Sequence, residues 1–337
     1  MFLILSAGFP LLAAEDRVQV KLDTSEADSV LAILAKRKQA QPLTDADWNT
    51  LFATDPYQRL KKREAAMQRS FSDDDFRTFV LADELLQQYD DLARTLAAWK
   101  RIDMRAGGLR VLPYLPAQAE IHVKVFPEIK PTHNSFVFDV DTDPAIFLYL
   151  DPNVSPQEFD NTVSHEMHHI GLSSTERLYE KKLSTLTPAS QKAALWMGAF
   201  GEGLALLAAA GGPDVPPNVY SQPDRQANWE LGMKNFSGDL ATLDVFFWQV
   251  LDGHLQGDAV DQKAYTFFGA IQGPWYTVGY RMAVLVEKRF GRPALIECML
   301  DPRQLLARYN QAAEELNASG KDHLPLWSPQ VLKGVTN

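Results

Sequence analysis

The chain has 337 residues, of which 46% are hydrophobic and 23% are charged, and its formal net charge is −10. These values are typical of a globular protein with one large domain or two lobes, and they exclude a small module held together by disulfides, because Cys298 is the single cysteine. The acidic balance and the lack of any lysine- or arginine-rich run argue against a nucleic-acid partner.

The first 14 residues predict a secretory signal peptide. An apolar run over 2–12 precedes the small pair Ala13 and Ala14, and charged residues follow. The run is too short to span a bilayer, and no basic residue precedes Arg17. A buried N-terminal helix is the alternative. The segment therefore predicts export, without stable membrane insertion after the signal is removed. An exported protein that can form no intrachain disulfide fits a bacterial periplasm or surface better than a eukaryotic secretory route, so we expect a bacterial periplasmic or secreted protein.

Residues 15–172 predict a helical layer followed by a small sheet. Apolar positions recur at helical spacing from Ser25 to about Ile102. The segments "AEIHVKVFP", "NSFVFDVD" and "AIFLYLDP" then predict three strands, because they are rich in β-branched and aromatic residues. Few residues separate them, so we expect a largely antiparallel sheet. The third strand lies either inside this sheet or at its edge, where a peptide could pair with it.

The segment "NTVSHEMHHIGL" belongs to the next predicted helix. Ser155 is a natural N-cap, Pro156 suits the first helical position, and Glu158 would complete a capping box. The helix should extend to about Ile170 and stop at Gly171.

Residues 173–337 predict an all-helical C-terminal lobe, which makes the fold class α+β and predominantly helical. One long apolar segment ends at a Gly-Gly-Pro sequence, and four further amphipathic segments follow it. The predicted helices of this lobe cover residues 193–210, 224–234, 240–255, 275–290 and 303–316.

The histidines of "HEMHH" have the spacing of a zinc site. His165 and His169 are four residues apart, so both imidazoles lie on one helix face and can reach one ion. Glu166 points about a quarter turn away, beside that ion, where a carboxylate can take a proton from bound water. The alternative is a histidine-rich helix without a metal. His168 faces away from this line, so we expect it at the surface, or else in contact with a ligand residue or substrate.

Glu202 is the best candidate for a third ligand. It is the one carboxylate in the apolar helix 193–210, and a lone buried carboxylate is costly unless it is paired or bound to a metal. Small residues around it, among them Gly203, would let this helix pack closely against the motif helix. Otherwise Glu202 lies at the rim of a tightly packed helix pair. Glu176 and Glu180 are rivals, but they follow the motif helix so closely that they should project into a surface segment.

Two tyrosines could stabilise an oxyanion. Tyr276 and Tyr280 are four residues apart in "GPWYTVGYRMA" and therefore share a helix face. Either phenol could donate to a tetrahedral intermediate. Aromatic packing in a core helix is an equally good reading of the pair.

Three segments carry a resemblance to a known family, in this order: "FDNTVSHEMHHIGL", "GEGLA" and "GPWYTVGYRMA". On these segments the chain resembles the gluzincin metallopeptidases, and more narrowly the bacterial "putative zinc-dependent peptidase" group. The likeness extends from the N-terminal helical layer to about Tyr309. It implies a zincin-like fold, one Zn²⁺ per chain on His165, His169 and Glu202, and Glu166 as the general base.

Two departures limit the resemblance to other zinc peptidases. Leu172 and Thr175 stand where metzincins have glycine and histidine, which excludes that class. Leu206 stands where thermolysin-like enzymes have an aspartate bonded to a ligand histidine, so the partner of that histidine is undefined.

The leading hypothesis is a zinc-dependent peptidase that acts on a peptide or protein substrate. An exported zinc- or peptide-binding protein without turnover is the alternative, although Glu166 would have no use there. A helical interaction protein without a metal is a third possibility. Neither the oligomeric state nor the substrate preference can be read from the sequence.

Overall fold

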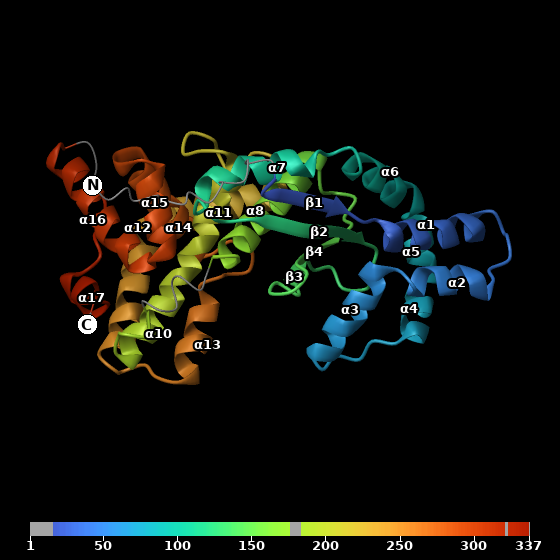
Figure 1. The fold of residues 1–337 in the computed structure, drawn as a ribbon, viewed down its shortest axis with the longest axis horizontal. Coiled ribbons are helices and arrows are strands. Elements are labelled where there is room, and N and C mark those ends of the chain that lie inside the picture. The colour runs from blue at the N-terminus through green and yellow to red at the C-terminus, as the bar shows by residue number, and fades with distance from the viewer. Residues whose placement is uncertain (1–15, 176–182, 321–322, 337) are drawn as a thin grey trace, which may run out of the picture.

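A computed structural model describes residues 16–175, 183–320 and 323–336. The signal peptide predicted over 1–14 and the rival ligands Glu176 and Glu180 lie outside the described residues. Figure 1 shows an elongated molecule with the N-terminal helices at one end, the C-terminal helices at the other, and a small sheet between them. The described part is α+β and mainly helical, as predicted.

Short helices make up the N-terminal layer. Their apolar residues recur at helical spacing and form one side of the main core. The predicted helical layer is confirmed. Its helices are α1 (Ser25–Lys38), α2 (Asp45–Phe52), α3 (Asp55–Ala66), α4 (Asp73–Val80), α5 (Asp83–Gln87) and α6 (Tyr89–Trp99), followed by α7 (Met104–Val111) and η1 (Leu112–Tyr114).

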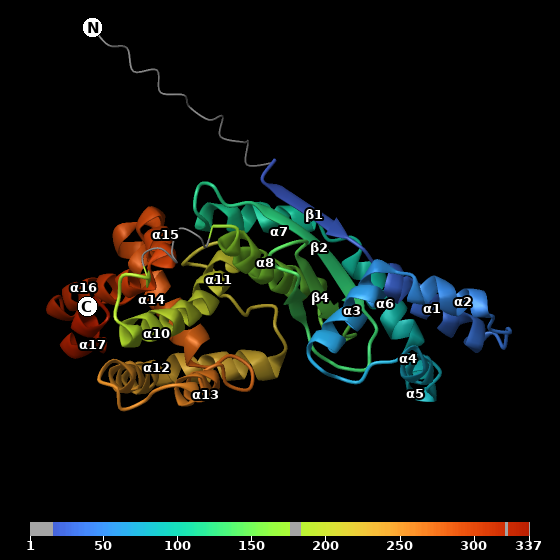
Figure 2. The ribbon, with the colours of Figure 1, turned by 60° about the horizontal axis from the view of Figure 1, so that its bottom comes forward.

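The sheet has four strands in the described part of the chain, in the order β1-β2-β4-β3. Figure 1 labels all four strands, and Figure 2 shows β1, β2 and β4 beside one another. They are β1 (Val18–Leu22), β2 (Ile121–Glu128), β3 (Phe136–Phe138) and β4 (Ala145–Tyr149). The β1–β2 and β2–β4 pairs are parallel, and only β3–β4 is antiparallel.

The prediction of a largely antiparallel sheet was therefore wrong. β2 and β4 do not form a hairpin, because the chain first crosses to β3 and β4 then inserts between β2 and β3. The missed strand β1 adds a second parallel pair, with α1 to α7 in the connection to β2. Since β4 has neighbours on both sides, it is internal, and a peptide cannot pair along it as an edge strand.

Side chains alternate between the two faces of the sheet. On one face, Val125 and Ile146 join the main core, which also includes residues of α7 and α8. On the other face, Phe126 and Phe147 pack with Leu60 of α3 in a second, smaller core.

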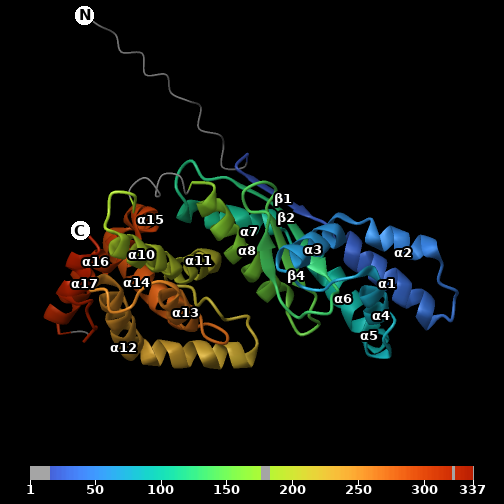
Figure 3. The same ribbon diagram turned by 90° about the horizontal axis from the view of Figure 1, so that it is seen from below.

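The C-terminal half is helical in its described residues. α8 lies beside the sheet, and the later helices gather toward one end of the molecule (Figure 3). Two predicted helices are joined in one long α12, while α13, α15 and α17 were not predicted. The elements are α8 (Pro156–Ser173), α10 (Pro188–Met197), η2 (Gly198–Phe200), α11 (Gly201–Ala210), α12 (Pro223–Leu251), α13 (Asp258–Thr266), α14 (Pro274–Phe290), α15 (Arg292–Leu300), α16 (Pro302–Ala318) and α17 (Pro329–Gly334).

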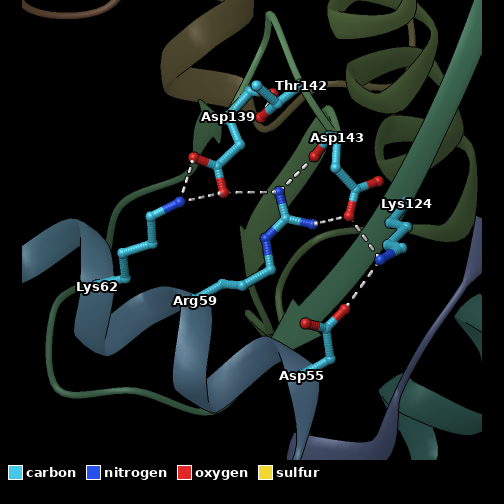
Figure 4. Close-up of polar contacts among 7 residues, drawn as sticks. All are labelled: Asp55, Arg59, Lys62, Lys124, Asp139, Thr142 and Asp143. Carbon is cyan, nitrogen blue, oxygen red and sulfur yellow. Dashed lines mark hydrogen bonds and ion pairs between the residues drawn. The ribbon is translucent and has the colours of Figure 1, made fainter.

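Charged side chains clamp α3 to the β3–β4 turn (Figure 4). Arg59 contacts Asp143 at 3.0 Å and Asp139 at 3.3 Å, and Lys62 donates to Asp139 at 2.9 Å. Lys124 of β2 joins the same turn through Asp143 at 2.7 Å. The side chains of Arg59 and Asp139 are only 9% and 16% exposed, so this ion pair is better shielded from solvent than an ordinary surface pair, and it links α3 to the start of the β3–β4 turn.

Candidate metal centre

The motif helix α8 begins as predicted but ends later. The Ser155 hydroxyl accepts a hydrogen bond from the backbone N–H of Glu158 at 3.1 Å, which confirms the N-cap. Gly171, predicted as the stop, lies inside the helix, which continues to Ser173. A Cβ at Gly171 would lie 2.4 Å from Leu115 Cδ1, so this glycine permits close packing and does not end the helix.

His165, His169 and Glu202 converge on one point. Nε2 of His165 lies 3.1 Å from Oε2 of Glu202 and 3.1 Å from Nε2 of His169, and His169 Nε2 lies 3.4 Å from the same carboxylate oxygen. Donors bound at 2.0–2.1 Å to a tetrahedral ion are about 3.3–3.4 Å apart. The three donor atoms therefore fit three corners of a zinc site, and they form a group of the kind that could hold a metal ion.

Glu202 reaches this point from a buried helix. The segment 188–210 is long and apolar enough to cross a membrane, but 61% of its most apolar window is buried inside the protein, as in a core helix. A Cβ at Gly203 would lie 2.0 Å from the backbone nitrogen of Tyr280. At Gly203 the closest approach is therefore made to α14, which it brings beside Glu202, while α11 also packs against the motif helix α8 as expected.

Glu202 and the two imidazoles set each other's charge. Burial disfavours the charged form of His169, but the carboxylate of Glu202 outweighs burial and raises the pKa of His169 to about 9. Burial likewise opposes ionisation of Glu202, yet the two histidines lower its pKa far below the usual range. The carboxylate is therefore ionised at any physiological pH, which is the form that binds a metal.

Tyr276 and Tyr280 differ in their surroundings. The ring of Tyr276 stacks at 6.4 Å on that of His165, and burial together with the charge of Glu202 raises the pKa of its phenol. The Tyr280 hydroxyl faces the carbonyl of Val215 at 3.5 Å, and its pKa is raised to about 12 by burial and then by Asp214. Only Tyr276 is thus in electrostatic contact with the metal-binding cluster.

The surroundings of His168 and of the second ring nitrogen of His165 also bear on the site. His168 is fully buried, so the expected surface position was wrong, and burial lowers its pKa well below the usual value, which keeps it neutral. Nδ1 of His165 is buried and has no hydrogen-bond partner among the described residues. Thermolysin-like enzymes have an aspartate at the position of Leu206. The leucine side chain cannot accept a hydrogen bond from a ligand histidine, as the sequence indicated.

A cavity of about 130 Å³ adjoins the cluster. Glu166 lines it together with His165 and Tyr276, so a carboxylate lies beside the point where the three donors meet. Sequence reasoning missed other polar side chains in its wall. These are Glu158, Asn161, Thr162, Asn218, Ser221, Arg225 and Gln272. The first three belong to the motif helix α8, where only Glu158 was singled out, as a capping residue. The other four come from segments far away in the chain that share no motif with it, so the sequence did not point to them.

Comparison with known proteins gives one match. The model of the family described as "Putative zinc dependent peptidase (DUF5700)" matches residues 48–318. No curated protein and no solved structure matches the chain.

Proposed function

The chain belongs to the family described as "Putative zinc dependent peptidase", and from this premise we propose that it hydrolyses peptide bonds at the cluster on α8 and α11. His165, His169 and Glu202 would hold one zinc ion. The observation that carries this proposal is the convergence of three donor atoms within 3.4 Å of one another from two separate helices. Bound zinc supplies a lowered pKa for its water and polarises a carbonyl.

Glu166 is the general base of this proposal. Its carboxylate lines the cavity next to His165, where it can accept a proton from the attacking water and pass it to the leaving amine. A pure binding protein has no use for a carboxylate at this point.

Tyr276 is the proposed oxyanion donor. Its raised pKa keeps the phenol protonated, so it can donate a hydrogen bond to the carbonyl oxygen as negative charge develops there. Tyr280, the other candidate, packs edge-on against Trp229 at 5.1 Å and is better explained as a core residue.

The substrate of this proposal is a peptide or protein, met outside the cytoplasm. The apolar segment 2–12 supports export. Since β4 is internal, an extended peptide would have to pair with β3, which is the outer strand on that side of the sheet.

Metal content tests the first half of the proposal. Purified wild type should contain about one zinc per chain by elemental mass spectrometry, and His165→Ala and Glu202→Ala should lose it. His254→Ala removes an exposed histidine elsewhere and should keep the metal. A folded wild type that stays free of zinc when zinc is offered would refute the site.

Turnover tests the second half. Zinc-loaded wild type should cleave members of a mixed peptide library, and Glu166→Gln should bind zinc but lose cleavage by at least about a hundredfold. If Glu166→Gln cleaved as fast as wild type, the assignment of the base would be wrong.

A further inference from the structure

Arg225 is placed at the cavity beside the metal-binding cluster. It lies in the first turn of α12, whose N-terminal end points toward the sheet in Figure 3, and it lines the same 130 Å³ cavity as His165 and Tyr276. It is the one lysine or arginine among the described residues that line this cavity. The other charged residues there include Glu158 and Glu166, so Arg225 is the local source of attraction for an anion.

The position of Arg225 has a cost within its own helix. Cations in the first turn interact unfavourably with the positive end of the helix dipole. A compensating contact is therefore expected. The structure offers Glu158, whose side chain is 6% exposed and whose Oε1 lies 3.6 Å from Nε of Arg225. That distance exceeds the roughly 2.7–2.9 Å of a direct charge-assisted hydrogen bond.

Glu158 leaves the outer part of the guanidinium open. The Arg225 side chain is 45% exposed, and its two terminal nitrogens make no hydrogen bond to the described residues. The terminal nitrogens of a guanidinium form a fork that matches a carboxylate. Arg225 thus has a carboxylate near its Nε and keeps this fork available for another.

The cavity wall around Arg225 is already ordered. Asn218 donates to the side-chain oxygen of Gln272 at 2.9 Å, and Ser221 donates to Asn218 at 3.3 Å. Asn228, one turn along α12 from Arg225, donates to the backbone oxygen of Gln272 at 3.1 Å. These bonds tie the start of α12 to the segment before α14, so the part of the backbone that carries Arg225 is held in place.

Arg225 also lies within electrostatic reach of the reacting groups. Burial and Glu202 raise the pKa of the Tyr276 phenol, whereas the charge of Arg225 acts in the opposite direction. The cavity is smaller than the roughly 300–1,000 Å³ of common ligand sites, so it can take only one small part of a substrate. An anionic group bound there would lie next to the bond that is cleaved.

We propose that Arg225 binds a substrate carboxylate adjacent to the scissile bond, so that this protein favours peptides with a negative charge at that point. The carboxylate comes either from a free peptide C-terminus or from an acidic side chain. This inference rests on the proposed function, because it assigns the substrate class of the same site.

Binding to an inactive variant tests the proposal directly. Zinc-loaded Glu166→Gln would be titrated with two pairs of short fluorescent peptides, one pair differing in a C-terminal acid or amide and the other in an internal glutamate or glutamine. The acid member of at least one pair should bind about ten- to a hundredfold more tightly than its neutral partner. The pair that shows the difference identifies the source of the carboxylate.

Substitutions assign the preference to Arg225. In the same Glu166→Gln background, Arg225→Met should reduce the acid-to-neutral affinity ratio to about one, while Arg225→Lys should retain part of it. Lys234→Met is the matched control, since it removes the same charge from an exposed position of α12. The control should leave the ratio unchanged.

The outcomes separate this inference from the proposed function. Equal binding within both pairs, or an acid preference that survives Arg225→Met, overturns the role of Arg225 even if wild type cleaves peptides. An Arg225-dependent acid preference in a protein that cleaves none of the peptides supports the carboxylate site and refutes the peptidase proposal.

Discussion

Glu202, whose side chain is 21% exposed, and Glu128, which is fully buried, are both carboxylates largely shielded from solvent, yet their environments have opposite effects on their charge. Two imidazoles lie within 3.4 Å of Glu202, and they lower its pKa despite burial. Glu128, at the end of β2, is fully buried, and neither of its oxygens has a hydrogen-bond partner among the described residues. Its nearest cation, Lys130, is 4.0 Å away, so burial raises the pKa of Glu128 to about 8.

A second acid shares the environment of Glu128. Glu26 of α1 is fully buried and accepts a hydrogen bond from the backbone of Ile129 at 3.0 Å. Burial, and then the charge of Glu128, raise the pKa of Glu26 well above its usual value. Burial alone therefore does not identify a functional carboxylate. What distinguishes Glu202 is its two imidazole neighbours, which can lose their protons and bind a metal ion together with the carboxylate. In the described part of the chain, Glu26, Glu128 and Lys130 have no imidazole of this kind beside them.

The largest expected effect is on zinc affinity, where Glu202 and Glu128 should differ most. Glu202→Gln should lower zinc affinity by more than about a hundredfold, because loss of a residue that only hydrogen-bonds to a metal ligand already costs up to about that much. Turnover should be lost together with the metal. Glu128→Gln makes the same chemical change at a buried site and should leave zinc affinity unchanged. Zinc titration against a competing chelator measures both. Equal zinc affinity in the two variants would mean that the cluster on α8 and α11 is not the metal site.

The next effect concerns Tyr276. Tyr276→Phe removes the proposed oxyanion donor and should reduce kcat by about 10²–10³-fold with little change in zinc content. Tyr280→Phe is the matched control, because its hydroxyl contacts only a backbone oxygen at 3.5 Å. Steady-state kinetics on one peptide substrate compares them. Equal losses of kcat in both variants would remove Tyr276 from the mechanism.

Sequence alone predicted those site residues that follow from local helix geometry or from one energetic argument. His165, Glu166 and His169 follow from helix periodicity, and Glu202 follows from the cost of a lone carboxylate in an apolar helix. Arg225 could not be found this way, since its place beside the cavity depends on how α12 packs against distant segments.

The fold shows the same limit. The N-cap at Ser155 is local and was predicted, whereas the insertion of β4 between β2 and β3 depends on long-range pairing that the short loops concealed. The tight contact of Gly203 was expected from its size, but its partner, α14, was not. Small residues indicate that a close approach occurs without identifying the neighbour.

A smaller effect follows from the charge of His169. Because Glu202 raises its pKa to about 9, the metal-free protein holds a proton on His169 at pH 7 that zinc must displace. Apparent zinc affinity should fall about tenfold for each pH unit below about 9, with about one proton released per zinc at pH 7. Calorimetry in buffers of different ionisation enthalpy counts that proton. Zinc binding without proton release would contradict the His169–Glu202 pairing.

The smallest effect is on stability and arises from Glu128. Its pKa is about 8 in the folded protein and near the ordinary 4.5 when unfolded, so between these values the folded state holds more protons. Stability should therefore fall as pH rises through this window, by at most roughly 1.4 kcal/mol per pH unit for one group. Glu128→Gln should flatten this fall and make the protein more stable than wild type at pH 7.

Urea denaturation at pH 5, 6 and 7 compares wild type with Glu128→Gln, and the difference between them cancels the contribution of His169. Lys130, whose pKa burial lowers to about 8, stays protonated in both states at these pH values and adds no slope. Glu84→Gln removes an exposed carboxylate and should change neither stability nor slope. If Glu128→Gln instead destabilised the protein equally at all three pH values, Glu128 would be an ionised partner of Lys130, and the contrast with Glu202 would disappear.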